Sequence, residues 1–474
     1  MKPIFFSFLF LLFSASIELR AQDNLEAFNN WKKKYGVRNE AVGVALVDLS
    51  SRENVFSFRS ESLMTPASTQ KLISTYLALE SFPSNHRFKT YIYQKASIED
   101  SVLLGDLLIL GGGDMSLGSR YFKDDFMSNW TDSLKKRGIK KIDGNIIANR
   151  GRFDEQMIPK TWSEDDIGNY YGAGSHGLSY FDNLYELHFK TGSVGSEASL
   201  KSIVPTPYEI EFTGKVRVEG INYDNCYIYG GPYENSRKMT GSLPPNRNDF
   251  LVKASQANPE RQLAFDLMEY FKGHGIEVAE GAKVDTVIGK HASFTLMFEY
   301  EGQALSDVVY WTNMKSVNLF AEQLLMHTIE ASGTSFSYKN AKRVQSEILR
   351  NKAFKTKGLA LNDGSGLSRE NLLSCDMLCS VLTKAYTQDY FPEYKKSLPL
   401  AGKSGSLKSM LLGSEAQGKI WAKSGSFKGV RAYAGYMTKE KKDLAFAVIM
   451  NDNSKSGSQM KKALEELILI LYQN

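Results

Sequence analysis

The chain has 474 residues, of which 42% are hydrophobic and 23% are charged, and its formal net charge is +5. This length and hydrophobic content suffice for two or three globular domains with real cores, and they exclude a largely disordered chain. The small positive excess gives no support for nucleic acid or a strongly anionic ligand as a partner.

The N-terminal segment predicts export. Residues 1–21 combine Lys2, an apolar run over residues 4–13 and a small residue at Ala21, which is the layout of a secretory signal peptide. We expect cleavage after Ala21, with a cut near Ala15 as the alternative, and a protein of the periplasm or cell envelope. An uncleaved N-terminal anchor is the other interpretation.

Cysteine and histidine usage argues against a disulfide framework and against a metal site. The three cysteines are an odd and sparse set for an exported chain. The six histidines show neither H-x-H nor H-E-x-x-H spacing. We therefore expect no metal and no other cofactor.

The elements expected near the N-terminus are too few to close a core. A short helix over residues 24–35 precedes two strands, 41–48 and 55–58, which read as a hairpin. An apolar helix then begins near Ser68. These elements must be completed by a later part of the chain.

The middle of the chain predicts inserted domains. Strand-like segments with polar turns follow residue 87, and the segment 189–257 is rich in Val, Ile, Tyr, Gly and Pro. Helical spacing returns over residues 259–273. We expect one inserted domain from residues 87–188 and 258–302, with a nested β-rich insert over residues 189–257.

The last third supplies the missing part of the first. Three strands in short succession, 420–425, 429–437 and 444–450, indicate antiparallel neighbours. We expect residues 22–86 and 303–474 to form one domain around this sheet.

The C-terminal segment 458–472 predicts a helix with one apolar face. Glu465 and Glu466 argue against binding to anionic lipid, so packing on the sheet is the favoured interpretation. Peripheral association with a membrane surface stays open as the alternative.

The segment Ser68-Thr-Gln-Lys71 places a hydroxyl and an amine on the same face of the helix that Pro66 introduces. A desolvated lysine, or a lysine near a second cation, can accept the proton of such a serine. Because S-x-x-K also occurs at Ser133 and Ser458, the spacing alone equally fits an ordinary surface helix.

Two further motifs follow in chain order, Ser316-Val-Asn318 and Lys423-Ser-Gly425. The first is the only S-x-N in the chain, whereas K-[ST]-G is common and occurs at Lys190, Lys403, Lys423 and Lys455. Only Lys423 lies on a predicted strand with further strands behind it, where it can form the wall of a cleft.

The three motifs in this order are the signature of penicillin-binding proteins and related β-lactamases. The chain resembles the D-alanyl-D-alanine carboxypeptidase/endopeptidase branch of low-molecular-mass penicillin-binding proteins, which has large inserts after the S-x-x-K helix. Other matching segments are Gly105-Asp-Leu, Gly113-Asp114, Tyr171-Gly-Ala173, Asp363-Gly-Ser-Gly-Leu-Ser-Arg369 and Ala422-Lys-Ser-Gly-Ser426. Val317 and Ser424 replace the more usual Asp and Thr, but the hydroxyl, amide and amine groups are kept.

This resemblance implies an α/β (α+β) fold, with a serine β-lactamase/transpeptidase-like domain whose antiparallel sheet is flanked by helices, plus inserted β-rich domains. It also implies a serine D,D-peptidase that cleaves D-Ala-D-Ala bonds, extends to D-Ala-diaminopimelate crosslinks and is acylated by penicillin. The implied partners are peptidoglycan stem peptides and β-lactams, with no nucleic acid, and the oligomeric state is left unassigned.

The resemblance also implies roles for individual residues. Ser68 is the expected nucleophile and Lys71 its base, Ser316 and Asn318 relay protons and hold the substrate amide, and Lys423 binds the terminal carboxylate. Ser424, Gly425 and Ser426 are expected to bind substrate, and the backbone N–H groups of Ser68 and Ser426 to form an oxyanion hole. For the segment Asp363–Arg369 we favour a structural loop that braces the sheet over a catalytic role.

Asp166 and Tyr171 are candidates for binding the third stem-peptide residue, because a diaminopimelate ammonium calls for an acid beside an aromatic side chain. A solvated acidic loop is the alternative. A β-lactamase or an esterase on the same fold, or a non-enzymatic penicillin-binding scaffold of the envelope, are the competing functions. The complete set of Ser, Lys, Ser, Asn and Lys argues against the scaffold.

Overall fold

The computed structural model describes residues 25–151, 153, 156–285, 293–440 and 442–473, so the predicted signal segment lies outside the described residues. The chain divides into two compact units. The first unit contains the chain up to Glu80, Val309–Ser316 and Lys342–Asn474, and the second contains Ser81–Val308 and Val317–Ala341. The domain boundaries expected from the sequence stay a prediction.

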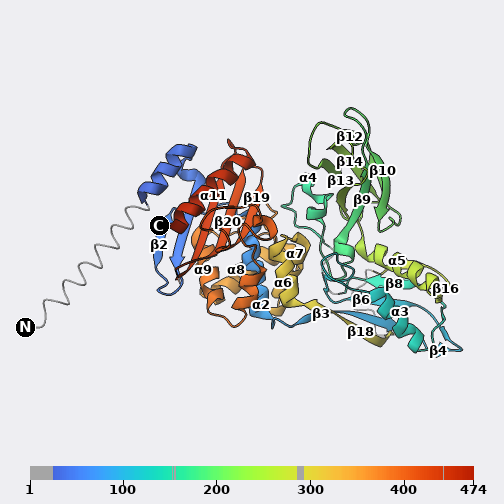
Figure 1. Cartoon of the computed structure of the whole chain (residues 1–474). Helices are drawn as coiled ribbons and strands as arrows, with labels where there is room; N and C mark the ends of the chain where they lie inside the picture. The colour runs from blue at the N-terminus through green and yellow to red at the C-terminus, as the bar shows by residue number, and fades with distance from the viewer. Residues whose placement is uncertain (1–24, 152, 154–155, 286–292, 441, 474) are drawn as a thin grey trace, which may run out of the picture. The chain divides into compact units, whose positions relative to one another are not determined.

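The first unit is built on an antiparallel five-stranded sheet in the order β19-β20-β21-β1-β2. Its strands are β1 (Val42–Asp48), β2 (Asn54–Phe58), β19 (Ile420–Phe427), β20 (Val430–Lys439) and β21 (Lys442–Asn451). The hairpin and the three C-terminal strands predicted from the sequence are thereby confirmed. The N- and C-terminal parts of the chain share this sheet, whose strands are blue and red in Figure 1. Strand β1 pairs with β21, from Val42 opposite Met450 to Asp48 opposite Leu444.

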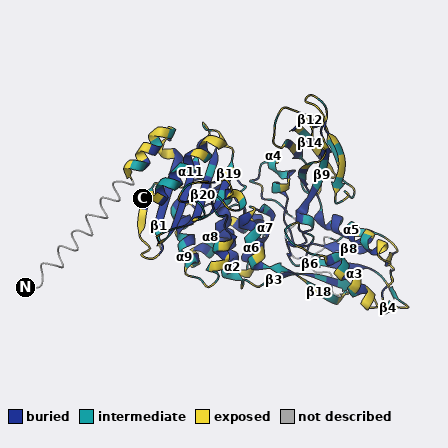
Figure 2. Ribbon diagram, viewed as in Figure 1, coloured by how far each residue is buried: buried dark blue, intermediate teal, exposed yellow. Residues whose placement is uncertain are grey.

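Side chains alternate between the two faces of this sheet, and helices cover both faces. Val44 and Tyr433 belong to one core with the helix over residues 25–35 and with α11 (Gly457–Gln473). On the other face, the hydroxyl of Tyr436 donates to the Leu382 carbonyl of α9 (Cys375–Tyr386) at 2.9 Å. The central strands are accordingly buried (Figure 2). The predicted packing of the C-terminal helix on the sheet is confirmed.

Helix α9 begins where its sequence provides a cap. The Ser374 hydroxyl accepts a hydrogen bond from the Met377 N–H at 3.1 Å, which satisfies one of the free donors of the first turn. Lys384 lies in the last turn, where a cation favours the helix dipole. The other helices of this part of the chain are α2 (Lys71–Ser81), α6 (Leu305–Met314), α8 (Tyr338–Asn351) and α10 (Phe391–Ser397).

The second unit contains a mixed five-stranded sheet in the order β17-β8-β6-β3-β18. Its strands are β3 (Arg87–Gln94), β6 (Leu107–Gly111), β8 (Ile146–Asn149), β17 (Ala282–Val284) and β18 (Thr295–Ala304). A smaller sheet, β16-β7-β5-β4, consists of β4 (Ile98–Glu99), β5 (Val102–Leu103), β7 (Lys141–Ile142) and β16 (Glu277–Val278). Helices α3 (Phe126–Lys136) and α5 (Pro259–Gly273) share its core.

The nested segment forms two further small sheets around a separate core that includes Leu187, Ile228 and Val252. One sheet contains β9 (Leu184–Lys190), β10 (Ser199–Val204) and β15 (Phe250–Ser255). The other contains β11 (Glu211–Gly214), β12 (Arg217–Val218), β13 (Asn225–Tyr229) and β14 (Ser236–Leu243). The β-rich character read from the composition is therefore present in the structure.

Helix α7 (Asn318–Ala331) completes the second unit and is buried from Leu319 to Ile329. Its Phe320 ring contacts the rings of Tyr121 and Phe122. Among the residues that the structure describes, no helix has the length and apolar character needed to cross a membrane.

Phe446, at the centre of β21, tests the core of the first unit. It is fully buried, so Phe446→Ala should lower the free energy of unfolding of this unit by about 3–5 kcal/mol through lost burial and a cavity. Urea unfolding followed by circular dichroism measures the change. Val55→Ala on the edge strand β2, where the side chain is exposed, is the control and should cost less than about 0.5 kcal/mol.

Candidate functional site

Ser68 lies next to a buried amine in the first unit. It is part of the short 3-10 helix η2 (Ala67–Gln70), and Lys71 is the first residue of α2. Ala67 has a φ of 47°, a left-handed conformation that turns the chain directly before Ser68. The Lys71 Nζ atom is buried and donates to Ser68 Oγ at 3.0 Å. The predicted reach of Lys71 to Ser68 is therefore present.

Lys423 and Ser316 form a second hydroxyl–amine pair. Lys423 is a buried residue of β19, and its Nζ donates to Ser316 Oγ at 2.9 Å and to the Ser424 carbonyl at 2.8 Å. Ser316 has a φ of 61°, which is uncommon for a residue other than glycine. Of the four K-[ST]-G lysines, the one predicted from its strand context is the one that binds the S-x-N serine.

Gly425 lets β19 run directly beside the Ser68 turn. A Cβ atom at Gly425 would lie 2.6 Å from the Pro66 carbonyl oxygen and 2.9 Å from the Ser68 nitrogen, so a larger residue does not fit. On either side of this glycine, Ser424 Oγ lies 2.8 Å from Ser406 Oγ, and Ser426 is exposed. The structure thus brings the two hydroxyl–amine pairs into one site of the first unit.

Burial lowers the pKa of the Lys423 ammonium well below its usual range, and the positive charge of Lys71 lowers it further. Both causes disfavour the charged form of Lys423. The site therefore holds two amines close together, and at Lys423 the balance is shifted toward the neutral amine.

The segment Asp363–Arg369 contributes to the same site, which the sequence did not reveal. Lys71 Nζ donates to the Ser365 carbonyl at 2.7 Å, and Ser74 Oγ donates to the Gly364 carbonyl at 2.6 Å. The D-G-S-G composition predicts a turn, but a turn does not show which distant helix it touches. The loop that we expected to brace the sheet is hydrogen-bonded to the S-x-x-K helix.

Asn318, Asp166 and Tyr171 lie together in the second unit. Asn318 is the first residue of α7, and its Nδ2 donates to the Tyr171 carbonyl at 2.7 Å. Burial, and then the charge of Asp166, raise the pKa of the Tyr171 hydroxyl above its usual range, and the two side chains are hydrogen-bonded. Asp166 belongs to the short helix α4 (Glu164–Ile167). These three residues therefore form one local cluster.

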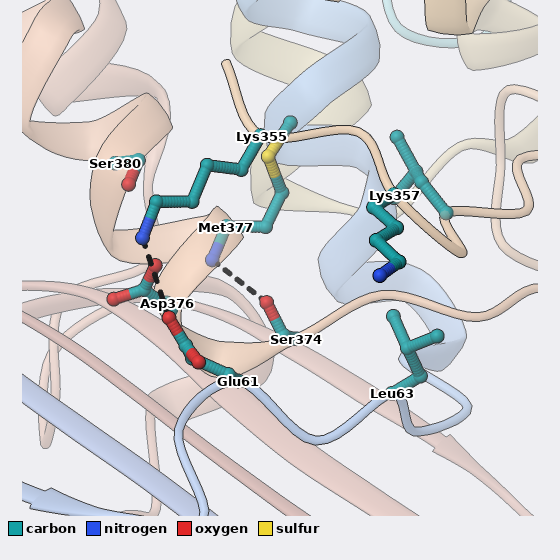
Figure 3. Close-up of a pocket in the computed structure, with 9 residues that line it drawn as sticks. Glu61, Leu63, Lys355, Lys357, Ser374, Asp376, Met377 and Ser380 are labelled. Atoms are coloured by element: carbon teal, nitrogen blue, oxygen red, sulfur yellow. Dashed lines mark hydrogen bonds and ion pairs between the residues drawn. The ribbon is translucent and has the colours of Figure 1, made fainter.

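Metal-binding groups, cysteines and pockets are other features that could carry chemistry. The described residues contain no group of three His, Cys, Asp or Glu side chains suited to a metal ion, and the three cysteines are buried free thiols. A pocket of about 250 Å³ in the first unit is drawn in Figure 3. It is lined by Glu61, Leu63, Lys355, Lys357, Leu359, Ser374, Asp376, Met377 and Ser380, so none of the predicted site residues lines it.

The lowered pKa of the buried Lys423 amine leads to a stability prediction. Lys423→Met keeps the length of the side chain and removes the amine, so the first unit should gain about 1–2 kcal/mol of unfolding free energy at pH 7. The lysine pKa is lower in the folded than in the unfolded chain, so the penalty of its burial decreases as pH rises and vanishes above about 10.4. Urea unfolding from pH 7 to 10 should therefore show a shrinking gain. If the extra unfolding free energy of Lys423→Met grew with pH, the pKa of Lys423 could not be lowered in the folded protein.

Comparison with known proteins assigns the family. The sequence matches the profile of the D-Ala-D-Ala carboxypeptidase 3 (S13) family over residues 29–469. It is 24% identical to the D-alanyl-D-alanine carboxypeptidase of Actinomadura sp. (strain R39) over 424 residues, which cover 87% of this chain and 78% of that protein. It is 23% identical to the D-alanyl-D-alanine carboxypeptidase DacB of Haemophilus influenzae over 435 residues, which cover 90% and 88%.

The fold is similar to that of a solved relative. Penicillin-binding protein 4 (DacB) of Haemophilus influenzae superimposes with a TM-score of 0.78 at 23% identity, covering 91% of this chain and 96% of that one. A second structure of that protein, complexed with a β-lactam, gives a TM-score of 0.72. The predicted α/β fold class is confirmed. Because the family profile covers nearly the whole sequence, the chain belongs to the D-Ala-D-Ala carboxypeptidase 3 (S13) family and is a serine-type carboxypeptidase.

Proposed function

We propose that this enzyme cleaves the D-Ala-D-Ala bond of peptidoglycan stem peptides with Ser68 as the nucleophile. The observation that carries this assignment is the 3.0 Å hydrogen bond between Lys71 Nζ and Ser68 Oγ in a buried setting. A serine hydroxyl is a weak nucleophile until a neighbouring base accepts its proton, and Lys71 is placed to do so.

The reaction proceeds in two steps. Lys71 accepts the Ser68 proton while Oγ attacks the carbonyl carbon of the penultimate D-Ala. The C–N bond then breaks, the leaving nitrogen takes up the proton that Ser68 released, the terminal D-Ala leaves as the free amine, and an acyl-serine remains. Water then attacks the acyl-serine carbonyl and gives a proton to Lys71, the bond to Oγ breaks, and Lys71 returns that proton to Ser68 as the shortened peptide leaves.

Residues of β19 are proposed to hold the substrate. Lys423 binds the terminal carboxylate together with the hydroxyls of Ser424 and Ser426. The backbone N–H groups of Ser68 and Ser426 form the oxyanion hole, which the close approach of β19 at Gly425 supports.

The two polar residues of the S-x-N motif are proposed to complete this chemistry. Ser316 shares a hydrogen bond with Lys423 and is proposed to relay to the leaving nitrogen the proton that Lys71 took from Ser68. Asn318 follows two residues later, and its amide is held by the Tyr171 carbonyl, which supports a role in binding the substrate amide.

A β-lactam should occupy the same groups as the peptide, because it also presents a carbonyl and a carboxylate. The related protein of Haemophilus influenzae has been crystallised with a β-lactam. Benzylpenicillin should therefore add once to the protein, and Ser68→Ala should abolish the adduct. Intact-mass spectrometry measures the label, and a labelled Ser68→Ala protein would show that the nucleophile is another residue.

Turnover assays separate this function from the alternatives. A D,D-peptidase should release D-Ala from diacetyl-Lys-D-Ala-D-Ala and hydrolyse nitrocefin only slowly, whereas a β-lactamase should show the reverse. An esterase should hydrolyse ester substrates, and a scaffold should turn over none of them. The chain belongs to a family of D-Ala-D-Ala carboxypeptidases, and the predicted signal segment favours export, so we also propose a location in the cell envelope.

We propose further that Asp166 binds the ammonium group of a diaminopimelate side chain, which would extend the activity to crosslinked peptides. Asp166 is partly exposed and hydrogen-bonded to Tyr171, whose carbonyl holds Asn318. A carboxylate in this local cluster lies beside an aromatic ring. These contacts support a specificity role for Asp166 rather than a part in the chemical step.

Asp166→Asn should lower kcat/KM for diaminopimelate peptides about tenfold, because a partly buried charge-assisted contact is lost. Acylation by benzylpenicillin should stay within about twofold, since the drug lacks an ammonium group at that position. Asp165→Asn is the matched control, because Asp165 is the exposed neighbouring acid of the same short helix. Equal losses for peptide and drug, or equal effects of both variants, would remove Asp166 from the substrate site.

A further inference from the structure

We propose that Asp363 is a positioning residue that orients the Lys71 amine through the carbonyl of Ser365. This inference rests on the proposed role of Lys71 as the base. It concerns a carboxylate that is hydrogen-bonded to its own loop and to Gln70, and it gives that carboxylate a role in catalysis rather than in stability alone.

The Asp363 carboxylate is fully buried and surrounded by donors. Its Oδ1 accepts from the Gly366 N–H at 2.9 Å and from Asn371 Nδ2 at 2.7 Å, and its Oδ2 accepts from the Ser368 N–H at 2.7 Å. These bonds close the chain from residue 363 to residue 371 into one compact loop. The loop is thus shaped around a single buried negative charge.

The S-x-x-K segment holds this loop from outside. Gln70 Nε2 donates to the backbone carbonyl of Asp363 at 2.5 Å and to Oδ1 of the Asp363 side chain at 3.0 Å. Gly366 has a φ of 79°, and a Cβ atom there would lie 2.1 Å from the Ala67 carbonyl oxygen. The loop therefore lies directly against the turn that carries Ser68.

The loop presents two successive carbonyls to α2. The Gly364 carbonyl accepts from Ser74 Oγ at 2.6 Å, and the Ser365 carbonyl accepts from Lys71 Nζ at 2.7 Å. The position of the Ser365 carbonyl is fixed on both sides, by the Gly364–Ser74 bond and by the Asp363 turn. The acceptor that Lys71 meets is consequently part of a rigid loop.

A carbonyl accepts hydrogen bonds and cannot donate them, so it dictates how the amine is oriented. When Lys71 is neutral, Nζ has two N–H bonds and one lone pair. In the structure Nζ donates both to Ser68 Oγ and to the Ser365 carbonyl. In the neutral amine, an N–H bond kept on Ser365 allows the lone pair to take the position that faces the Ser68 hydroxyl, which is the arrangement that proton removal requires. If the carbonyl moved, the amine could rotate away from Ser68.

The loop requires a carboxylate because donors surround the Asp363 side chain. An asparagine at this position would direct its own NH₂ group at one of those donors and displace the turn. Asp363→Asn should therefore slow acylation of Ser68 by benzylpenicillin about 10- to 100-fold through misplacement of Lys71. The non-covalent binding constant of the drug should change little, since the Lys423 pair lies outside the loop.

Stopped-flow measurement over a range of benzylpenicillin concentrations separates the acylation rate constant from the non-covalent binding constant. Thermal unfolding measures the stability of each variant. The matched control is Asp452→Asn, since Asp452 is also buried in the first unit and accepts from the N–H and the hydroxyl of Ser454. A slowed acylation step in Asp363→Asn alone supports the proposal. An unchanged step, or a loss that both variants share in proportion to their stability, overturns it.

Should Asp363→Asn fail to fold, Ser74→Ala tests the same carbonyl pair by removing one small hydroxyl. A slower acylation step at unchanged drug binding supports the role of the loop, and a wild-type rate overturns it. Failure of the proposed function is a separate result, because Ser68→Ala would then still take up the label.

Discussion

Two lysines buried close together impose the main constraint on the first unit. A buried amine needs hydrogen-bond acceptors in either protonation state, because burial of a polar or charged group without partners is strongly unfavourable. In both cases the structure provides one serine hydroxyl and one backbone carbonyl. The acceptors are Ser68 and Ser365 for Lys71, and Ser316 and Ser424 for Lys423. The serines and lysines of the S-x-x-K, S-x-N and K-S-G motifs thus satisfy each other's hydrogen bonds within the first unit.

In the proposed mechanism, repulsion between these two amines affects the protonation of Lys423 and the binding of the substrate carboxylate. Burial and the charge of Lys71 shift Lys423 toward its neutral form. A substrate carboxylate beside Lys423 would reverse that shift, because an opposite charge favours the protonated amine. A substrate with a free carboxylate would therefore supply a negative charge that offsets the repulsion between the two amines. This explains in physical terms why a carboxypeptidase and a β-lactam binder can share one site.

The sequence predicted those parts of the fold and site that depend on local pattern. Alternating and helical spacing identified the β1–β2 hairpin, the three C-terminal strands and α11. Motif order selected Ser68 and Lys423 as candidates, and each forms a hydroxyl–amine pair in the structure. The sequence did not predict contacts that depend on which distant segments meet. The bond between Gln70 and Asp363 spans 293 residues, and a D-G-S-G turn looks the same wherever it packs. Likewise, the left-handed conformation of Ser316 follows from its surroundings, because its residue type disfavours it.

The position of Ser68, the proposed nucleophile, depends on the last strands of the chain. The Asn451 side chain at the end of β21 accepts from the Thr65 N–H at 2.9 Å and donates to the Thr65 carbonyl at 3.1 Å, three residues before Ser68. This contact spans 386 residues, with the whole second unit between its partners. Loop-closure entropy grows only slowly with length, so a long insert adds little thermodynamic penalty, but it delays the long-range pairing. The turn that carries Ser68 is therefore held by the last strand of the sheet, so the two ends of the first unit must be paired for this turn to have the observed position.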